Sequence, residues 1–563
     1  MCDISGFTGS EIIPLEQYGA VNAHRGPDGT NYFYSPDFNV AHSLLAISPN
    51  KYNIQQPYED PRTGNVLAYN GEIYGLGDKF DTIHLSDMLN DGKWRELSNN
   101  TNGMWAFVYF DRNKQTVTMC RDHFGVKPLY YSILSEQLYF ASTPKPLIMA
   151  QNTLGYGVEI NQWRLRQFQA NDRFPIGEGH PLRGIHRVPP GGIVKFDLIT
   201  RKIIEKNSLW QGFHVSPNYR WTKQEVHDKV EKAVKDVCTA PGIKKTISLS
   251  GGLDSTLIAS VAKKHDIEIS ATTMRFRKQK STKKVPVNER MYSEFDIAKK
   301  TCEEKDIPFN WSYYKEDKEA TFAALSTPMW DINRTGPRYA NIKKAASQGN
   351  KIYIVGDGAD ELITGYSGDA KYVDDPHKFG LSAKKMQRLS DNANRKKWND
   401  GSVVCFAEFI HIFPNWKTHL GDDAINNHRL YRALVHCDGF NTTADHLAGS
   451  FGMESRVPFL HQELAKYLLN IPAGVKLQTP GNETLQAEGF VDNNNTYQGA
   501  YKYLLRDLCR EFLPDHVRTR GRKIGFANPV NARDHELNKE IGAEEIKGYY
   551  RDAKNWSFDV DLD

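Results

Sequence analysis

The residues Ser250–Ser255 have the types and spacing of a loop that holds phosphate groups. They read Ser-Gly-Gly-Leu-Asp-Ser and follow the apolar, β-rich stretch Thr246–Leu249. A strand that breaks into Ser-Gly-Gly before a helix exposes backbone N–H groups at the helix's positive end, which suits a polyphosphate. Glycine is needed because a Cβ atom would keep phosphate oxygens away from the backbone. The loop lacks the Lys of the Gly-x4-Gly-Lys-Ser/Thr pattern, and a plain tight turn is the alternative.

The start of the chain, Met1-Cys2, offers a second reactive group. A small second residue permits removal of the initiator Met, which leaves a cysteine with both a thiol and a free α-amino group. That pairing is a nucleophile with its own base, as in N-terminal nucleophile enzymes. The pair is weak evidence alone, because any chain can begin with these two residues.

Further segments support a role for Cys2. In order along the chain, four of them resemble the class II glutamine amidotransferase domain: His24–Gly29, Tyr69–Tyr74, Gly103–Phe107 and Arg121–Tyr131. Three later segments resemble the synthetase domain of glutamine-hydrolysing asparagine synthetases: Gly356–Glu361, Glu454–Leu460 and Lys502–Arg506. The loop Ser250–Ser255 resembles the pyrophosphate loop of N-type ATP pyrophosphatases. The resemblance runs from Cys2 to about Pro529, and the order of the motifs across two domains makes it specific.

This resemblance implies a glutaminase site in the first domain. A thiolate at Cys2 would attack the side-chain carbonyl of glutamine, with the α-amine relaying the proton. The oxyanion then needs preorganised donors, which the resemblance assigns to the Asn70 side chain and the Gly71 N–H. Asp81 matches the acid that holds the substrate's α-ammonium, although Asn-Gly is also a common hairpin turn. The implied glutamine-binding set is Leu44, Ile47, Asn70, Gly71, Glu72 and Asp81.

One member of this set departs from the family. Where the family has an arginine that clamps the α-carboxylate of glutamine, this chain has Leu44. An aliphatic side chain cannot make the charge-assisted bonds that a guanidinium offers a carboxylate. Three alternatives follow. Another cation, such as Arg25 or Arg62, binds the α-carboxylate; glutamine binds poorly; or the amide donor is not glutamine. Our hypothesis is weakened use of glutamine with retained use of ammonia.

The second implied site activates a carboxylic acid as an acyl-adenylate, with pyrophosphate as the leaving group. Charge on the phosphate oxygens calls for Mg²⁺ and a lysine. Asp254 and Asp360 match the family's magnesium-binding acids, and Mg²⁺ prefers such ligands together with substrate phosphates. Lys502 matches the lysine that contacts the α-phosphate. The implied ATP-binding set is Ser248, Ser250, Gly251, Gly252, Asp254, Ser255, Met274, Val355 and Gly356.

Three further positions depart from the family's usual residues. Asp357, taken as catalytic together with Cys2, Asn70, Gly71 and Lys502, stands where Glu is common. Its shorter side chain keeps the charge but could reshape the acceptor pocket. His461 replaces a usual Asp, and Arg275 replaces a usual Gly. Six cations occur from Arg275 to Lys284 without an intervening acid, which favours a solvated loop or, alternatively, contact with an anionic acceptor or partner.

Composition limits the class of protein. At 563 residues the chain is too long for one core, and 39% hydrophobic with 25% charged residues is typical of a soluble globular protein. No apolar run approaches a membrane span, and the N-terminus lacks the form of a signal peptide. A net charge of +4 is too mild to imply a nucleic-acid partner. The cysteines are scattered and odd in number, which argues for a reducing cytoplasm and against a zinc site: Cys2, Cys120, Cys238, Cys302, Cys405, Cys437 and Cys509.

The elements divide the chain into two parts. The first is β-rich, with expected strands at 40–48, 66–69, 105–111, 117–121 and 138–142. It suits the α+β N-terminal nucleophile (Ntn) hydrolase sandwich, αββα, that the resemblance implies. From residue 246, strands and helices alternate with the βαβ rhythm of a parallel sheet, expected at 246–249, 254–263, 267–276, from 293, 309–314 and 351–356. Residues 399–509 are expected to be mostly helical.

We therefore expect three regions: an amidotransferase domain (2–208), a synthetase or ATP-pyrophosphatase domain (209–530), and a polar tail (531–563). The Asn-rich stretch 492–499 and the tail are expected to be exposed. The resemblance implies that aspartate, ATP and glutamine give asparagine, AMP, pyrophosphate and glutamate, with a possible homodimer and an internal path for ammonia. The alternatives are a related enzyme that amidates another carboxylate, an ammonia-preferring synthetase with weak glutaminase activity, and a catalytically silent descendant that binds ATP or partners.

Overall fold

A computed structural model describes residues 2–10, 12–47, 55–77, 79–162, 164–165, 177–210, 213, 219–276, 287–314, 327, 332–363, 424–471, 502, 505–506 and 510–518. Three of the segments discussed above lie outside these residues: most of the basic segment (277–284), the Asn-rich stretch 492–499 and the tail 531–563.

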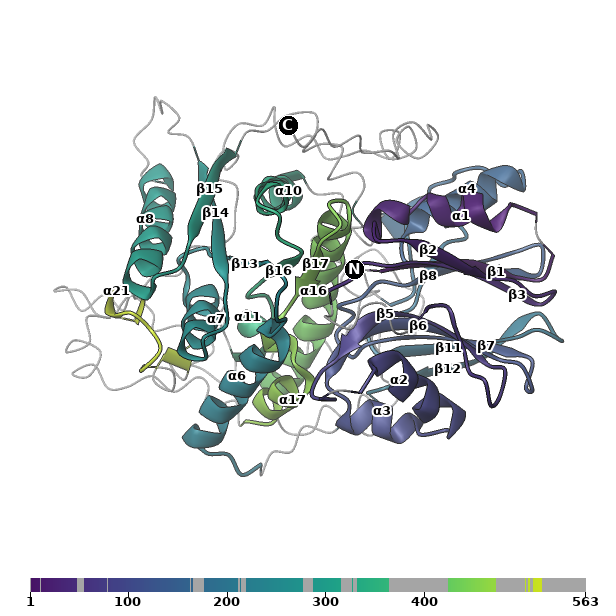
Figure 1. Cartoon of the computed structure of the whole chain (residues 1–563), viewed down its shortest axis with the longest axis horizontal. Helices are drawn as coiled ribbons and strands as arrows, with labels where there is room; N and C mark the ends of the chain where they lie inside the picture. Colours follow the sequence, from purple (N-terminus) through teal and green to yellow (C-terminus); the bar gives the residue numbers. More distant parts are fainter. Residues whose placement is uncertain are drawn as a thin grey trace, which may run out of the picture.

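The first part of the chain forms two antiparallel six-stranded sheets that face each other (Figure 1). One sheet has the order β10-β8-β9-β1-β3-β2 and comprises β1 Asp3–Thr8, β2 Thr30–Phe33, β3 Phe38–Ser43, β8 Tyr130–Leu134, β9 Gln137–Ala141 and β10 His186–Arg187. The other has the order β12-β11-β7-β6-β5-β4 and comprises β4 Tyr58–Glu59, β5 Val66–Ile73, β6 Gly103–Asp111, β7 Thr116–Arg121, β11 Gly192–Asp197 and β12 Lys202–Ser208.

Helices cover the outer face of each sheet. The helices α1 (Leu15–Ala20) and α4 (Pro144–Thr153) pack on the first sheet, and α2 (Asp81–Asn90) and α3 (Trp94–Asn100) pack on the second. Strands buried on both faces read as continuous apolar runs. In β6, Ala106, Val108 and Phe110 point between the sheets, whereas Phe107 and Tyr109 point to the helices. The expected αββα sandwich is confirmed.

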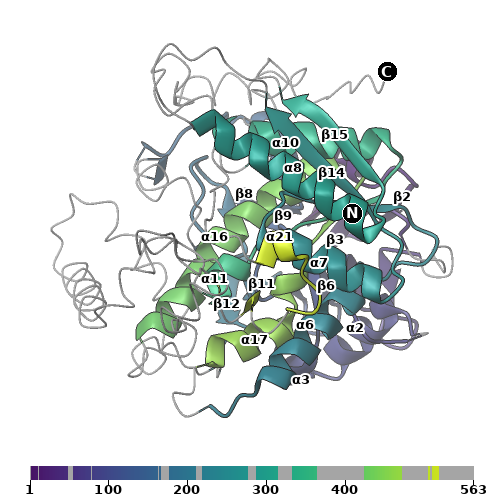
Figure 2. The ribbon, with the colours of Figure 1, turned by 90° about the vertical axis from the view of Figure 1, so that its left-hand side faces the viewer.

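The second part is built on a parallel sheet of order β15-β14-β13-β16-β17. Its strands are β13 Lys245–Ser248, β14 Ser270–Phe276, β15 Phe309–Tyr314, β16 Ile352–Ile354 and β17 Glu454–Arg456. Its described helices are α6 Lys223–Cys238, α7 Leu253–Lys264, α8 Val287–Lys305, α10 Ile332–Ser347, α11 Ala359–Ile363, α16 Ala424–Gly449, α17 Gln462–Asn470 and α21 Asp515–Arg518. Short 3-10 turns occur at Ala23–Arg25 and Pro458–Leu460. Figure 2 looks onto the β15 edge, with α8 beside it.

The expected alternation of strands and helices is confirmed, with shifted ends. The helix expected from 293 begins at Val287, and Asn70-Gly71 lies inside β5 rather than in a hairpin turn. The stretch 399–509 was expected to be mostly helical. Its described part holds α16 and α17, but β17 lies between them and joins the sheet. That strand lacks an apolar signature because two of its three residues, Glu454 and Arg456, are charged.

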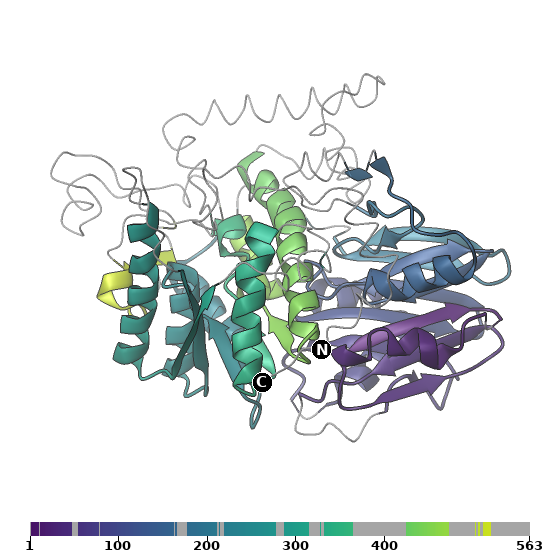
Figure 3. The same cartoon turned by 90° about the horizontal axis from the view of Figure 1, so that it is seen from above.

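The helix α16 and strand β17 lie where the two parts meet (Figures 1 and 3). Two acids on α16 reach into the β-sandwich. Asp438 pairs with Arg121 (2.9 Å) and Arg187 (2.7 Å), and Asp445 contacts Arg25 (2.5 Å). All of these side chains are buried. Among the described helices, none combines the length and apolar character that crossing a bilayer requires.

Candidate active sites

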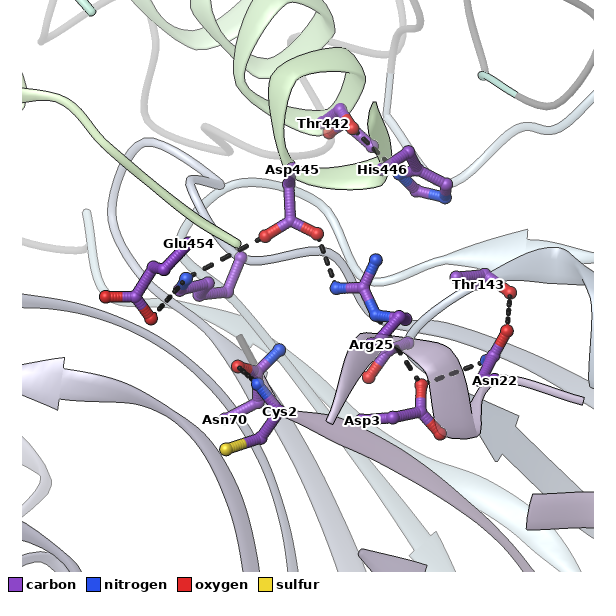
Figure 4. Close-up of polar contacts among 12 residues, drawn as sticks. Cys2, Asp3, Asn22, Arg25, Asn70, Thr143, Thr442, Asp445, His446 and Glu454 are labelled. Carbon is purple, nitrogen blue, oxygen red and sulfur yellow. Dashed lines mark hydrogen bonds and ion pairs between the residues drawn. The ribbon is translucent and has the colours of Figure 1, made fainter. Parts of the chain in front are cut away.

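The nucleophile candidate Cys2 lies at the start of β1, beside Asn70 of β5 (Figure 4). Its backbone nitrogen donates a hydrogen bond to Asn70 Oδ1 over 3.1 Å. Burial raises the pKa of the Cys2 thiol, and a hydrogen bond from the Leu45 backbone together with the charge of Lys127 lowers it in part. The segment that carries Leu44 and Ile47 therefore runs beside the thiol.

Asn70 and Gly71 have the features of an oxyanion pocket. The Asn70 side chain is fully buried, and its Nδ2 has no hydrogen-bond partner among the described residues. A buried amide donor without a partner is costly, so this one suits a ligand oxygen. Gly71 pairs with Trp105, and a Cβ on Gly71 would lie 2.2 Å from the Met104 carbonyl oxygen. Only glycine fits this position of the strand.

Two acids of the implied glutamine set have partners within the protein. Asp81 begins α2, accepts hydrogen bonds from Tyr69 Oη (3.2 Å) and the Thr82 backbone (2.8 Å), and has a pKa raised by burial. Glu72 forms an ion pair with Arg456 of β17. Its carboxylate is thus directed toward the second part of the chain.

The two proposed substitutes for the missing arginine are already engaged with carboxylates. Arg25 is buried and contacts Asp445 and, over 3.8 Å, Asp3. Arg62 is exposed and pairs with Asp60 (2.8 Å) and Asp87. Leu44 donates its backbone N–H to Gly29 over 2.8 Å.

Sequence reasoning missed a buried charge cluster between the two parts. Lys127 lies 3.0 Å from Glu454 and 3.8 Å from Asp445, and Glu454 accepts a hydrogen bond from Arg456 over 2.9 Å. Although burial opposes ionisation, the charges of Lys127 and Arg456 lower the pKa of Glu454 to about 2. The only sequence signal was the motif Glu454–Leu460, which carried the family resemblance but no role.

The Ser-Gly-Gly loop leaves the central strand β13 and enters α7. Gly251 has φ +74° and lies so close to α8 that a Cβ would be 2.4 Å from the Glu294 carbonyl oxygen. Ser250 Oγ accepts the Gly252 N–H over 3.2 Å and contacts Ser255 Oγ at 3.2 Å. Hydrogen bonds within the loop fix its shape, and it cannot accept a larger residue at Gly251.

The end of the neighbouring strand β16 closes on this loop. A Cβ on Gly356 would lie 3.2 Å from both Asp254 Cβ and the Ser255 backbone nitrogen. Parallel strands bring such loops together at their carboxyl ends, where ligands bind in α/β sheets. Val355 and Gly356 therefore adjoin the Ser-Gly-Gly loop.

Lys502 lies between the two acids matched to magnesium. Its Nζ is 2.8 Å from Asp360 Oδ1 and forms an ion pair with Asp254. Burial lowers the pKa of Lys502, but the two carboxylates outweigh it and raise the pKa. Two carboxylates that already share one cation, beside a loop suited to phosphates, fit the ligands that Mg²⁺ takes.

The remaining ATP-set residues lie on adjacent strands. Ser248 ends β13, and its Oγ accepts a hydrogen bond from Asn341 Nδ2 of α10 over 3.0 Å. Met274 lies on β14, where its Sδ is 3.4 Å from Ser312 Oγ.

The three departures from the family pattern each have a partner. Asp357 pairs with Arg338 (3.0 Å), His461 Nε2 donates a hydrogen bond to Asp236 Oδ2 (3.1 Å), and the Arg275 guanidinium lies over three aromatic rings: Phe295 (4.9 Å), Trp311 (5.7 Å) and Tyr313 (5.8 Å). Arg338 gave no signal in the sequence, because nothing local marks it.

The fold joins an Ntn-type sandwich, with Cys2 directly before its first strand, to a parallel α/β sheet that carries the Ser-Gly-Gly loop. The chain belongs to the asparagine synthase family, whose model matches residues 225–547, and a glutamine amidotransferase domain model matches residues 1–207. The suspected family resemblance is confirmed.

Three relatives show the range of this similarity. The chain is 25% identical to asparagine synthetase [glutamine-hydrolyzing] 1 of Bacillus subtilis, over 94% of this chain and 85% of that protein. It is 23% identical to amidase chyE of Penicillium rubens, over 90% and 83% of the two chains. It is also 23% identical to asparagine synthetase B [glutamine-hydrolyzing] of Escherichia coli, over 99% and 88%.

Proposed function

We propose that this chain amidates a carboxylic acid at the expense of ATP, with aspartate as the acceptor and asparagine as the product. Glutamine or ammonia supplies the nitrogen, and AMP, pyrophosphate and glutamate are the other products. The observation that carries the proposal is Lys502 held between Asp254 and Asp360 beside the Ser-Gly-Gly loop. A buried lysine with two carboxylates at a phosphate loop suits adenylation better than simple binding.

In the first domain, proposed as residues 2–208, Cys2 attacks the glutamine side-chain carbonyl once Met1 is removed. Asn70 Nδ2 and the Gly71 N–H receive the oxyanion, and Asp81 holds the α-ammonium. The free Asn70 donor next to Cys2 supports this assignment. One oxyanion donor typically contributes about 3 kcal/mol to lowering the barrier.

In the second domain, proposed as residues 209–530, the acceptor carboxylate attacks the α-phosphorus of ATP and pyrophosphate leaves. Backbone N–H groups of Ser250–Gly252 receive the phosphates, whose oxygens replace the present hydrogen bonds from Ser250 and Gly252 to the loop's own hydroxyl groups. Lys502 stabilises charge on the α-phosphate. Asp254 and Asp360 would hold Mg²⁺, which offsets the charge of the leaving pyrophosphate when bound. Ser248, Met274, Val355 and Gly356 border the adenosine.

A different acceptor is the second candidate, favoured by one observation. Asp357, next to the site where the acyl group would be aminated, is paired with Arg338. Such a pair changes the charge that the pocket presents to an acceptor. The relative from Penicillium rubens, which matches 90% of this chain, is named an amidase, and this supports the second candidate.

The test is mass spectrometry of products after incubation with ATP, Mg²⁺, an ammonia donor and a panel of amino acids. We expect asparagine, AMP and pyrophosphate with aspartate, and no product from Lys502→Met. Lys263→Met, at the far end of α7, is the control and should keep wild-type activity. A different amide would select the second candidate, and the absence of pyrophosphate with every acid would reject adenylation.

We also infer a reducing, cytosolic location. The described cysteines are free, and four of the five are buried, which suits a compartment without disulfide formation.

A further inference from the structure

Asp357 and Arg338 form an ion pair at the carboxyl end of β16. Arg338 Nη2 lies 3.0 Å from Asp357 Oδ2 and 3.3 Å from Asp357 Oδ1. Arg338 is only 9% exposed, so its charge is removed from water and needs this partner. The pair joins α10 to the loop that follows the strand.

That loop touches the phosphate loop. Gly356, the residue before Asp357, packs against Asp254 and Ser255 so closely that a methyl group would not fit without a shift. Asp357 therefore lies one residue from the wall of the proposed nucleotide site. Under the proposed function, its carboxylate borders the place where the activated acyl group meets the incoming nitrogen. A small displacement of its carboxylate would change the geometry of that reaction.

The other terminal nitrogen of Arg338, Nη1, ties the guanidinium to α16. Nη1 donates to the Phe440 carbonyl oxygen of α16 over 3.0 Å, and the guanidinium lies 5.7 Å from the Phe440 ring. One turn along α10, Asn341 binds Ser248 and the Tyr353 hydroxyl, both at 3.0 Å. Helix α10 thus contacts the end of β13 through Asn341 and the loop that follows β16 through Arg338.

We propose that Arg338 is a positioning residue for the amide-forming step, acting through Asp357. This inference rests on the proposed function. Ammonia attacks the acyl carbon, so that a C–N bond forms and the C–O bond to AMP breaks. One proton leaves the nitrogen, and Asp357, directed by Arg338, accepts it. AMP departs with the electron pair of the broken bond.

A double-mutant cycle tests whether Arg338 acts through Asp357. Four proteins are compared: wild type, Arg338→Met, Asp357→Asn and the double variant. For each we measure ammonia-dependent amide formation, the KM values for ATP and aspartate, and glutamine hydrolysis. Arg338→Lys restores a charge next to Asp357 without the second nitrogen, and Lys344→Met removes a charge elsewhere on α10.

We expect Arg338→Met to lower kcat for amide formation at least tenfold, with the KM for ATP and the rate of glutamine hydrolysis within twofold of wild type. In the Asp357→Asn background, the same change should alter kcat less than twofold. Arg338→Lys should recover most of the loss, and Lys344→Met should match wild type.

Two results would overturn the inference. The first is an Arg338→Met enzyme with wild-type kcat, and the second is an equal loss with and without Asp357. If Arg338→Met does not fold, the cycle is run with Arg338→Gln, which removes the charge but keeps a hydrogen-bond donor, and the same comparison decides. A wild-type enzyme that releases no pyrophosphate defeats the proposed function instead, so the two failures are distinguishable.

Discussion

Arg456 of the parallel sheet forms an ion pair with Glu72, which directly follows the oxyanion candidates Asn70 and Gly71. Arg456 also donates to Glu454 over 2.9 Å and to the Val237 carbonyl oxygen over 2.9 Å. The end of β5, which pairs with β6 in its own sheet, is therefore also braced by the synthetase part. We therefore expect the geometry of the first site to depend on contact with the second part of the chain.

The variant Arg456→Met tests this dependence. Removing one member of a buried ion pair leaves an unpaired carboxylate and typically costs about 3–5 kcal/mol. We expect a loss of that size in the free energy of unfolding, and a larger loss of glutamine-dependent than of ammonia-dependent synthesis. Arg112→Met, which breaks an exposed pair with Glu59 (3.1 Å), is the control and should cost at most about 1 kcal/mol. Equal effects of the two variants would contradict the prediction.

Asn70→Ala should separate the two nitrogen sources. Loss of one oxyanion donor lowers kcat about 10²–10³-fold in comparable hydrolases. We expect that loss in glutamine hydrolysis, with ammonia-dependent synthesis within twofold of wild type. Cys2→Ala should abolish hydrolysis, whereas Cys120→Ala, at a buried cysteine of β7, should leave it intact. Hydrolysis that survives Cys2→Ala would remove the nucleophile from its role.

Leu44→Arg should improve the use of glutamine. Arg25 and Arg62 are both committed to carboxylates, so neither substitutes readily for the arginine that the family carries. A new charge-assisted bond to the substrate α-carboxylate is worth about 1.5–3 kcal/mol, or roughly 10- to 100-fold in KM. Steady-state kinetics with glutamine and with ammonium measure the effect, and Leu44→Gln provides the uncharged control. A wild-type KM for glutamine in the micromolar range would show that no such cation is missing.

Acid should destabilise the protein through buried histidines of the β-sandwich and of α16. Burial lowers the pKa of His180 to about 3, and that of His42 and His446 to about 4. Between these values and about 6.5 the unfolded state binds more protons, so stability is complete above pH 6.5 and is lost as the pH falls toward 4. Each histidine should cost about 1.4 kcal/mol by pH 5.5.

Asp3 opposes this trend. Burial raises its pKa to about 6, against about 4 when unfolded, so its folded form gains stability as the pH falls through that window. Asp3 alone offsets less than the three histidines lose, and burial also raises the pKa of Glu72 and Asp81, which adds to its effect. Urea unfolding at pH 7.5, 6.5 and 5.5 measures the net slope, and His446→Gln should flatten it. An unchanged urea midpoint across this range would refute the prediction.

Local sequence patterns predicted most of the strands and helices. The β6 strand was predictable because its apolar run matches a strand buried on both faces, and the Ser-Gly-Gly loop because glycine and helix start coincide. The strand β17 was not predictable, since Glu454 and Arg456 are buried only through partners distant in sequence. The role of Arg338 could not be predicted for the same reason, because its partner Asp357 lies outside its own helix.

The two acids of α16 bear on how such chains can be recombined. Asp438 and Asp445 each reach basic side chains of the β-sandwich, and all of them are shielded from water. A hybrid built by grafting a foreign amidotransferase half onto this synthetase half would inherit both acids. Unless the grafted half supplied matching guanidinium and ammonium groups, Asp438 and Asp445 would be buried unpaired carboxylates at the interface. The hybrid would then lose the contact between its two halves first.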